Sequence, residues 1–153
     1  MLGRTYEREN CSAARALEVI GERWSLLILR NALYAGSTRF NQFQRSLGIA
    51  SNILTTRLDW LVQSGLMESR SATDGTETRE YVLTAKGLDL EPVILALSAW
   101  GDRWSAPDGP PIIYHHSDCG GQVHQYLKCD RCQQSPEPGY ITAMPGPGMP
   151  VTA

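Results

Sequence analysis

The chain has 153 residues, and 42% of them are hydrophobic, which suffices for one domain or for a smaller domain with an appendage. Its formal net charge is −2, so the overall composition does not point to nucleic acid as a partner. No run approaches the roughly 20 apolar residues of a membrane span, and the polar residues 1–10 lack the apolar region of a signal peptide. We therefore expect a cytoplasmic protein without membrane contact, whose four cysteines are reduced, metal-bound or redox-active rather than paired in structural disulfides.

Two helices are predicted at the start of the folded part. Residues 13–20 are rich in alanine, leucine and other helix-forming residues, and Gly21 separates them from the next helix. That second helix, residues 22–33, has apolar side chains on most of its surface, so we expect it to be buried, including Trp24.

Cys11 stands where the first helix begins, and two interpretations of it are open. The positive end of the helix dipole and Arg15, one turn further on, would lower the pKa of the thiol and raise its reactivity. The alternative is a small buried side chain that only packs. The residues alone favour this second interpretation.

The most informative stretch contains two short helices joined by a tight turn. The first is predicted from Thr38, its expected N-cap, to Leu47, where Gly48 ends it. The second is predicted from Ser51, its expected N-cap, to Ser64. Together they predict a helix-turn-helix.

A hairpin follows these helices at once. Residues 66–71 and 77–83 are strand-like, and Asp74-Gly75 in their connection is a strong turn signal. Helix, turn, helix and hairpin in this order predict a winged helix-turn-helix. The expected fold class is α+β, mainly α, with flanking dimerisation helices and a small C-terminal segment of zinc-knuckle type.

The second helix of this motif has the side chains that a helix in the major groove needs. Amides, hydroxyls and guanidinium groups match the donors and acceptors of base edges. An ordinary solvated helix face is the alternative, and the adjacent hairpin argues against it. The residues expected to read bases are Asn52, Thr55, Thr56 and Arg57, beside Ser51, and those expected to hold phosphates or the minor groove are Arg39, Arg45, Arg70 and Arg79. Positive and negative charges balance between residues 36 and 90, so affinity for DNA depends on how the charges are arranged and on a dimer that doubles the contacts.

A longer helix is predicted from Thr84, its N-cap, to about Trp104, with a kink near residues 88–91 caused by Pro92. One face of this helix carries an apolar stripe. It suggests packing against the same helix of a second subunit, or against the first helix of the same chain. The stripe consists of Val93, Leu97, Trp100 and Trp104.

After a linker at residues 105–114, histidines and cysteines crowd into a short segment. Its two pairs of ligand type, each with two intervening residues, are His116 with Cys119 and Cys129 with Cys132. Four such ligands fit a tetrahedral structural Zn²⁺ site, and a segment with so little apolar content could hardly fold without a metal. His115 or His124 could take the place of His116. A redox pair of Cys129 and Cys132, or a disordered tail, are the alternatives.

The chain resembles the HxlR family of bacterial regulators, which are relatives of the MarR-type winged-helix proteins. The resemblance covers about residues 11–104. The residues that carry it are Cys11, 16–30 (ALEVIGERWSLLILR), 39–43 (RFNQF), 49–58 (IASNILTTRL), 64–66 (SGL), 81–87 (YVLTAKG) and 100–101 (WG). It implies a homodimer assembled through the first and last helices, with one recognition helix in each half of a palindromic operator. Several members of the family sense electrophiles or oxidants through a cysteine at the position of Cys11.

The sequence therefore predicts a dimeric transcriptional regulator that binds double-stranded DNA, a repressor more often than an activator in such families. The expected domains are residues 1–104 for DNA binding and dimerisation and residues 115–153 for a zinc-binding tail with a mobile Gly- and Pro-rich end. The main alternative is a protein-interaction module whose tail docks a partner. An enzyme is not expected, because no nucleophile–base constellation is present and Cys129 and Cys132 lie outside any βαβ pattern.

Overall fold

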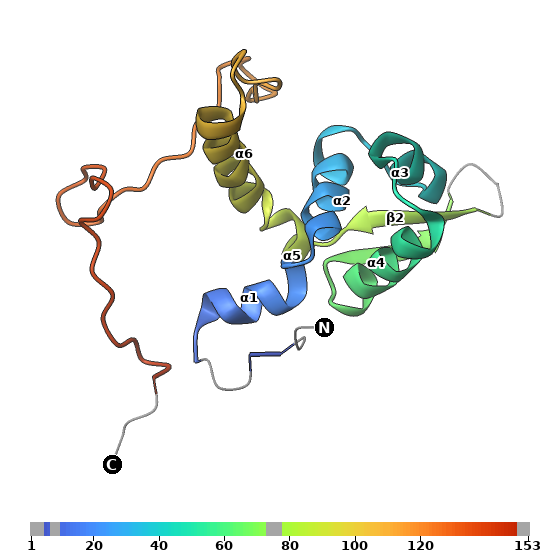
Figure 1. The fold of residues 1–153 in the computed structure, drawn as a ribbon, viewed down its shortest axis with the longest axis horizontal. Helices are drawn as coiled ribbons and strands as arrows, with labels where there is room; N and C mark the ends of the chain where they lie inside the picture. The colour runs from blue at the N-terminus through green and yellow to red at the C-terminus, as the bar shows by residue number, and fades with distance from the viewer. Residues whose placement is uncertain (1–4, 7–9, 73–77, 150–153) are drawn as a thin grey trace. The chain divides into compact units, whose positions relative to one another are not determined.

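The structure is a computed structural model that describes residues 5–6, 10–72 and 78–149. It divides into two compact units, residues 1–94 and 95–153. Among the helices of the described residues, none is long and apolar enough to cross a membrane. The elements are, in chain order, α1 (Ser12–Ile20), α2 (Arg23–Tyr34), α3 (Phe40–Leu47), α4 (Ser51–Gln63), β1 (Met67–Ser71), β2 (Arg79–Leu83), α5 (Ala85–Leu88) and α6 (Glu91–Ser105), and all but β1 are labelled in Figure 1.

The first two helices lie close to where the sequence predicts them. Helix α1 follows Cys11, which is its N-cap residue but makes no side-chain capping bond. Helix α2 begins after Glu22, whose carboxylate accepts a hydrogen bond of 3.0 Å from the backbone N–H of Trp24. The expectation that Trp24 is fully buried is wrong. Its ring is half-buried, with the guanidinium of Arg23 5.0 Å from its centroid.

The helix-turn-helix is present, although its caps differ from those expected. The N-cap of helix α3 is Arg39 and not Thr38. The side-chain oxygen of Gln42 accepts hydrogen bonds from the backbone N–H of Thr38 at 2.8 Å and from that of Arg39 at 2.9 Å. Gly48 then ends α3 in the left-handed region, with a φ of 62° that a residue without Cβ adopts freely. In α4, Ser51 is the first helical residue and not the N-cap, and no side chain caps this helix.

The wing is a two-stranded antiparallel sheet whose register runs from Met67 opposite Leu83 to Ser71 opposite Arg79. The expected turn at Asp74-Gly75 lies outside the described residues. The hairpin also bonds to the segment before α3, because the backbone N–H of Tyr81 in β2 donates to the carbonyl of Thr38 at 2.7 Å. This bond fixes the wing to the start of α3.

A single core holds the first unit together, and α4 supplies three of its fully buried side chains. The core packs α4 against α2, α3 and the start of β1, so that one face of α4 is fixed and the other remains exposed. The indole N–H of Trp60 also donates to the carbonyl of Val19 at 2.8 Å, which joins α4 to the end of α1. The buried hydrophobic residues are Ile20, Ile28, Leu29, Phe43, Ile49, Leu54, Leu58, Leu61, Leu66, Met67 and Ile94.

The predicted long helix is interrupted where Pro92 was expected to bend it. Thr84 caps α5 as predicted, because its hydroxyl accepts from the N–H of Gly87 at 3.1 Å. Helix α5 then ends at Leu88, and α6 begins at Glu91, so that Pro92 falls in the first turn of α6, where a missing N–H costs no helical hydrogen bond.

Gly87 packs so closely that no side chain fits at its position. A Cβ added there would lie 2.2 Å from the backbone carbonyl oxygen of Leu66. We expect Gly87→Ala to lower the free energy of unfolding by about 1–3 kcal/mol, because the backbone must move to relieve the overlap. Gly101→Ala is the matched control, since nothing lies within 4 Å of a Cβ there and the helix would gain up to about 1 kcal/mol. Urea denaturation of both variants measures the difference, and equal stabilities would contradict it.

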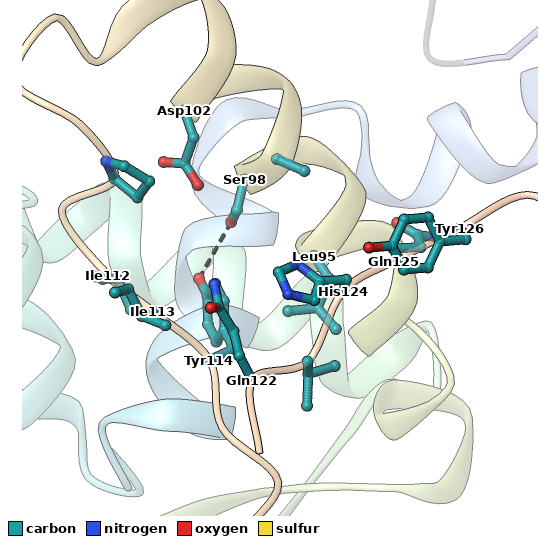
Figure 2. A pocket seen from close by; sticks show the side chains of 13 residues that line it. Leu95, Ser98, Asp102, Ile112, Ile113, Tyr114, Gln122, His124, Gln125 and Tyr126 are labelled. Carbon is teal, nitrogen blue, oxygen red and sulfur yellow. Dashed lines mark hydrogen bonds between the residues drawn. The ribbon is translucent and has the colours of Figure 1, made fainter. Parts of the chain in front are cut away.

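In the second unit, the chain after α6 lies against one face of that helix (Figure 2). No further helix or strand occurs between residues 106 and 149. A cavity of about 160 Å³ separates α6 from this segment, with Leu95 and Asp102 on its helix side. The hydroxyls of Ser98 and Tyr114 lie 3.2 Å apart and form a hydrogen bond across it.

Candidate nucleic-acid interface

Helix α4 presents a polar face opposite its buried leucines. The exposed side chains include Ser51, Asn52, Thr55 and Thr56, four of the residues that the sequence predicts to lie against DNA. They occupy the N-terminal half of the helix, the half that contacts base edges when a recognition helix enters the major groove. The structure therefore gathers these four residues on one surface.

The two threonines of this face have their hydroxyl groups turned toward the helix backbone. Thr55 donates to the carbonyl of Ser51 and Thr56 to that of Asn52, both at 2.9 Å. The hydroxyl hydrogen is thus already used, and each side chain offers an acceptor oxygen and a methyl group. Such a surface suits a base amino group or the methyl of thymine.

Arg57 lies to the side of this face rather than on it. It is half-buried, and its Nε lies 3.4 Å from the carboxylate of Glu22, the N-cap residue of α2. Because both side chains are still partly accessible to solvent, the ion pair contributes at most about 1 kcal/mol to stability. Its geometric consequence is larger, because it turns the guanidinium toward α2. No local pattern in the sequence reveals Glu22 as the partner of Arg57.

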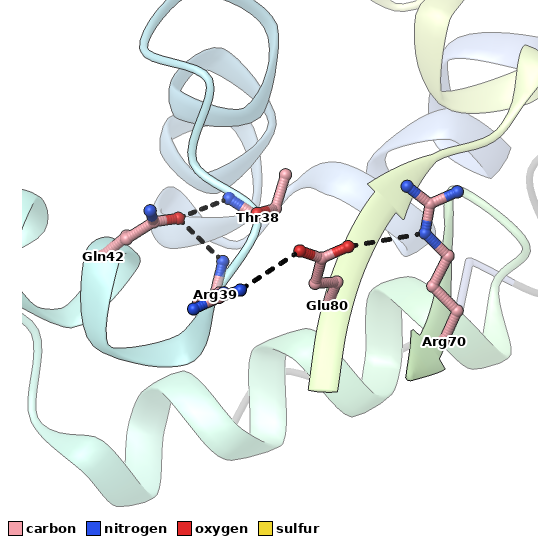
Figure 3. A network of polar contacts seen from close by, with 5 residues as sticks. All are labelled: Thr38, Arg39, Gln42, Arg70 and Glu80. Carbon is pink, nitrogen blue, oxygen red and sulfur yellow. Dashed lines mark hydrogen bonds and ion pairs between the residues drawn. The ribbon is translucent and has the colours of Figure 1, made fainter. Parts of the chain in front are cut away.

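Two of the arginines expected to hold phosphates share one carboxylate (Figure 3). Glu80 of β2 has one oxygen 3.7 Å from Nη2 of Arg39 and the other 3.6 Å from Nε of Arg70. Arg39 precedes α3 and Arg70 lies on β1, so Glu80 joins the helix-turn-helix to the wing. The three side chains retain one net positive charge, and no local pattern in the sequence marks Glu80 as their link.

The other two arginines of this group are exposed. Arg45 lies in the last turn of α3, and Arg79 begins β2. The surroundings of Tyr81 show how near the wing is to α4: burial raises the pKa of its phenol, Asp59 of α4 raises it further, and Arg79 lowers it. The wing and the exposed side of α4 therefore border one another.

A buried polar network that the sequence did not reveal fixes α3 on α2. Asn31 is 5% exposed, and its amide N–H donates to the hydroxyl of Ser46 at 2.8 Å. Arg30 donates to the amide oxygen of the same side chain at 3.0 and 2.8 Å. A buried amide satisfied on both sides holds one relative position of the two helices.

All four cysteines are free thiols. Cys11 is exposed, so the interpretation of a buried packing residue is wrong. In the tail, hydrogen bonds lower the pKa of the Cys129 thiol. They come from the backbone N–H groups of Cys132 and Arg131 and from the Cys132 thiol. Among the described residues, no three side chains of ligand type lie close enough together to hold one metal ion.

Comparison with known proteins agrees with this geometry. The family model of HxlR-like helix-turn-helix proteins matches residues 19–109, which is more than half of the chain. The chain belongs to the HxlR-like family of transcriptional regulators. Like other HxlR-like proteins it is a DNA-binding regulator and not an enzyme, and its helix-turn-helix is α3 and α4.

Three relatives show how far the similarity extends. The HTH-type transcriptional regulator Rv3095 of Mycobacterium tuberculosis is 43% identical over 141 residues, which are 92% of this chain and 89% of the relative. The solved structure of PA1607, described as a candidate transcription factor, is 36% identical with a TM-score of 0.81, and the match covers 91% of this chain and 97% of PA1607. The redox regulator HypR in its reduced form is 30% identical with a TM-score of 0.54, over 61% of this HxlR-like chain and 92% of HypR. The first two matches therefore extend beyond α6 into the tail.

Proposed function

We propose that the protein is a homodimeric, sequence-specific repressor that acts in the cytoplasm and binds a palindromic DNA operator. The observation that carries this proposal is the exposed polar half of α4, which borders a wing that carries arginines. In each subunit α4 enters the major groove of one half-site. The wing then lies along the phosphates or in the minor groove.

The two sets of side chains have different roles in this proposal. Asn52, Thr55 and Thr56 read bases, while Arg39, Arg45, Arg70 and Arg79 bind the DNA backbone. Arg57 also belongs to the base-reading set. To contact a base, Arg57 has to break its ion pair with Glu22. We therefore expect Arg57→Ala to weaken operator binding less than Asn52→Ala does.

The apolar stripe of α6 supports the dimer. Its side chains remain exposed, Trp100 at 64% and Trp104 at 66%, whereas Leu95, Ser98 and Asp102 on another face line the cavity against the tail. Large aromatic side chains in such a row are typical of an interface between subunits. In the first unit, Leu17 of α1 is also 53% exposed, so α1 offers an apolar side chain for a separate contact with the second subunit.

Two alanine variants test the division of roles. Asn52→Ala should weaken binding to the operator by about 1–3 kcal/mol per half-site and leave binding to unrelated DNA unchanged, because it removes a contact to a base edge. Arg79→Ala should weaken binding to both DNAs and flatten the plot of log K against log salt by about one unit per lost phosphate contact. Binding to operator and random DNA across a salt series measures both. An equal loss from Asn52→Ala on both DNAs would refute the base-reading role.

Regulation through Cys11 is a second proposal, which its exposure at the start of α1 favours. HypR, similar over 61% of this chain, is a redox regulator. We expect an oxidant to lower operator affinity at least about tenfold and a thiol reductant to restore it, because a modified Cys11 alters the start of α1, which the family resemblance assigns to the dimer interface together with the last helix. Cys11→Ser should abolish the response and leave the operator affinity of the reduced protein unchanged. The proposal fails if the oxidant acts equally on wild type and Cys11→Ser.

A further inference from the structure

The tail contains two turns with the same backbone geometry, although one begins with histidine and the other with cysteine. In the first, the N–H of Gly120 donates to the carbonyl of His116, and the N–H of His116 donates to the carbonyl of Gly121, both at 2.8 Å. In the second, the N–H of Gln133 donates to the carbonyl of Cys129, and the N–H of Cys129 donates to the carbonyl of Gln134, both at 3.0 Å. The spacing of these bonds is identical, so one turn repeats the other.

In each turn, the residue that follows the second candidate ligand, Cys119 or Cys132, has a backbone in the left-handed region. Gly120 has a φ of 72° and Gln133 a φ of 61°. Gln133 is the one residue other than glycine with a positive φ within the described ranges. A side chain in that region costs free energy, which surrounding structure has to offset. The second turn therefore adopts this shape against the preference of its own sequence.

The first turn already brings two ligands together. Nδ1 of His116 lies 3.3 Å from Sγ of Cys119. Tetrahedral zinc with bonds of about 2.05 Å to nitrogen and 2.3 Å to sulfur would separate those atoms by about 3.6 Å. Asp118 lies 3.7 Å from Nε2, the other ring nitrogen, where a carboxylate orients a metal-bound histidine.

The other two histidines of the tail are engaged differently. Nδ1 of His115 is hydrogen-bonded to the carbonyl of Gly120 at 2.8 Å. His124 lines the cavity beside α6, with its ring 5.9 Å from that of Tyr126. Among the contacts of the described residues, the hydrogen bond of His116 with Cys119 is the one that joins a histidine to a cysteine.

We propose that the two turns close on one zinc ion, bound by His116, Cys119, Cys129 and Cys132. Each turn supplies two of the four ligands, and because no three ligands lie close enough together among the described residues, metal binding requires the two turns to approach one another. The three thiols release their protons to solvent when they bind the metal. The closed site would stabilise a tail whose apolar side chains Tyr126, Leu127 and Tyr140 are exposed.

The chain between the turns is short enough for this closure. A backbone bond of 2.8 Å from Val123 to Tyr114 holds the first turn in a small hairpin, so residues 124–128 are the segment that has to bend. Five residues span at most about 17 Å, so the second turn always remains near the first. Closing so small a loop costs little entropy.

Metal titration of the full-length, reduced protein tests the site. We expect one zinc per chain by native mass spectrometry, and cobalt in its place should give the strong visible bands of a tetrahedral thiolate site. Cys129→Ser and His116→Gln should each weaken cobalt binding at least about tenfold. His115→Gln and His124→Gln are matched controls that should change it less than twofold, and Cys11→Ser should leave it intact.

Three results would overturn the proposal. They are reduced protein that binds no stoichiometric metal, a cobalt spectrum of octahedral type, and an equal loss from His115→Gln and His116→Gln. A Cys129–Cys132 disulfide that forms readily in the presence of zinc would identify a redox pair instead. Thermal unfolding of each full-length variant, followed by circular dichroism of its helices, confirms that the variant is folded.

Discussion

Replacing Leu58 with alanine should lower the free energy of unfolding by about 2–5 kcal/mol. Leu58 is 0% exposed on the buried side of α4, where it packs in the single core of the first unit. Truncation removes apolar contacts and leaves a cavity that the neighbouring helices cannot fill completely. Urea denaturation at fixed protein concentration measures the change, since the stability of a dimer depends on concentration.

Ile53→Ala is the control for this prediction, because Ile53 lies on the same helix and is 39% exposed. We expect it to cost less than about 1 kcal/mol. Leu58→Ala should reduce DNA binding only in proportion to the folded fraction, since the side chain faces away from the proposed interface. Equal costs for both variants would contradict the observed orientation of α4.

Replacing Trp100 with glutamate should raise the dissociation constant of the proposed dimer by at least about 100-fold. The variant places an unpaired carboxylate where a 64% exposed indole would be buried between subunits. Operator affinity should fall with it, because a monomer contacts one half-site. Analytical ultracentrifugation measures the dissociation, and DNA binding at the same concentrations measures its consequence.

Ser105→Glu adds the same charge to α6, one residue after Trp104 and off the apolar stripe. It should leave both the oligomeric state and operator binding close to those of the wild type. If Trp100→Glu remained dimeric while fully folded, α6 would not be the interface. The dimer would then have to form through another surface.

Local patterns predicted most of the fold. The apolar spacing in residues 51–63, the glycines that end helices and the break near Pro92 all depend on neighbours within a few residues, so the sequence displays them. The caps were predicted less well. Thr38 and Ser51 are good capping residues, but Gln42 caps α3 from inside the helix and α4 has no side-chain cap.

Ser51, Asn52, Thr55 and Thr56 share an exposed face of α4 as expected, but the sequence did not reveal the ion-pair partners of the arginines. Glu80 joins Arg39 to Arg70, and Glu22 holds Arg57, across separations in sequence that no local pattern reveals. These carboxylates also explain how a region without net charge can present arginines in defined positions. In the same way, the identical turns of the tail depend on backbone hydrogen bonds, which ligand spacing alone does not show.

The most direct test of the central claim is binding of the full-length protein to the DNA upstream of its own coding sequence, measured across a salt series. Arg45, Arg79 and the group of Arg39, Arg70 and Glu80 supply about three net positive charges to the proposed interface of each subunit, before the opposing charge of Asp59 is counted. A dimer that contacts about six phosphates should give a slope of log K against log salt of about −5, with binding that random DNA does not displace. Failure to bind this DNA at any salt concentration, together with salt-insensitive association with another protein, would contradict the account and favour a protein-interaction module.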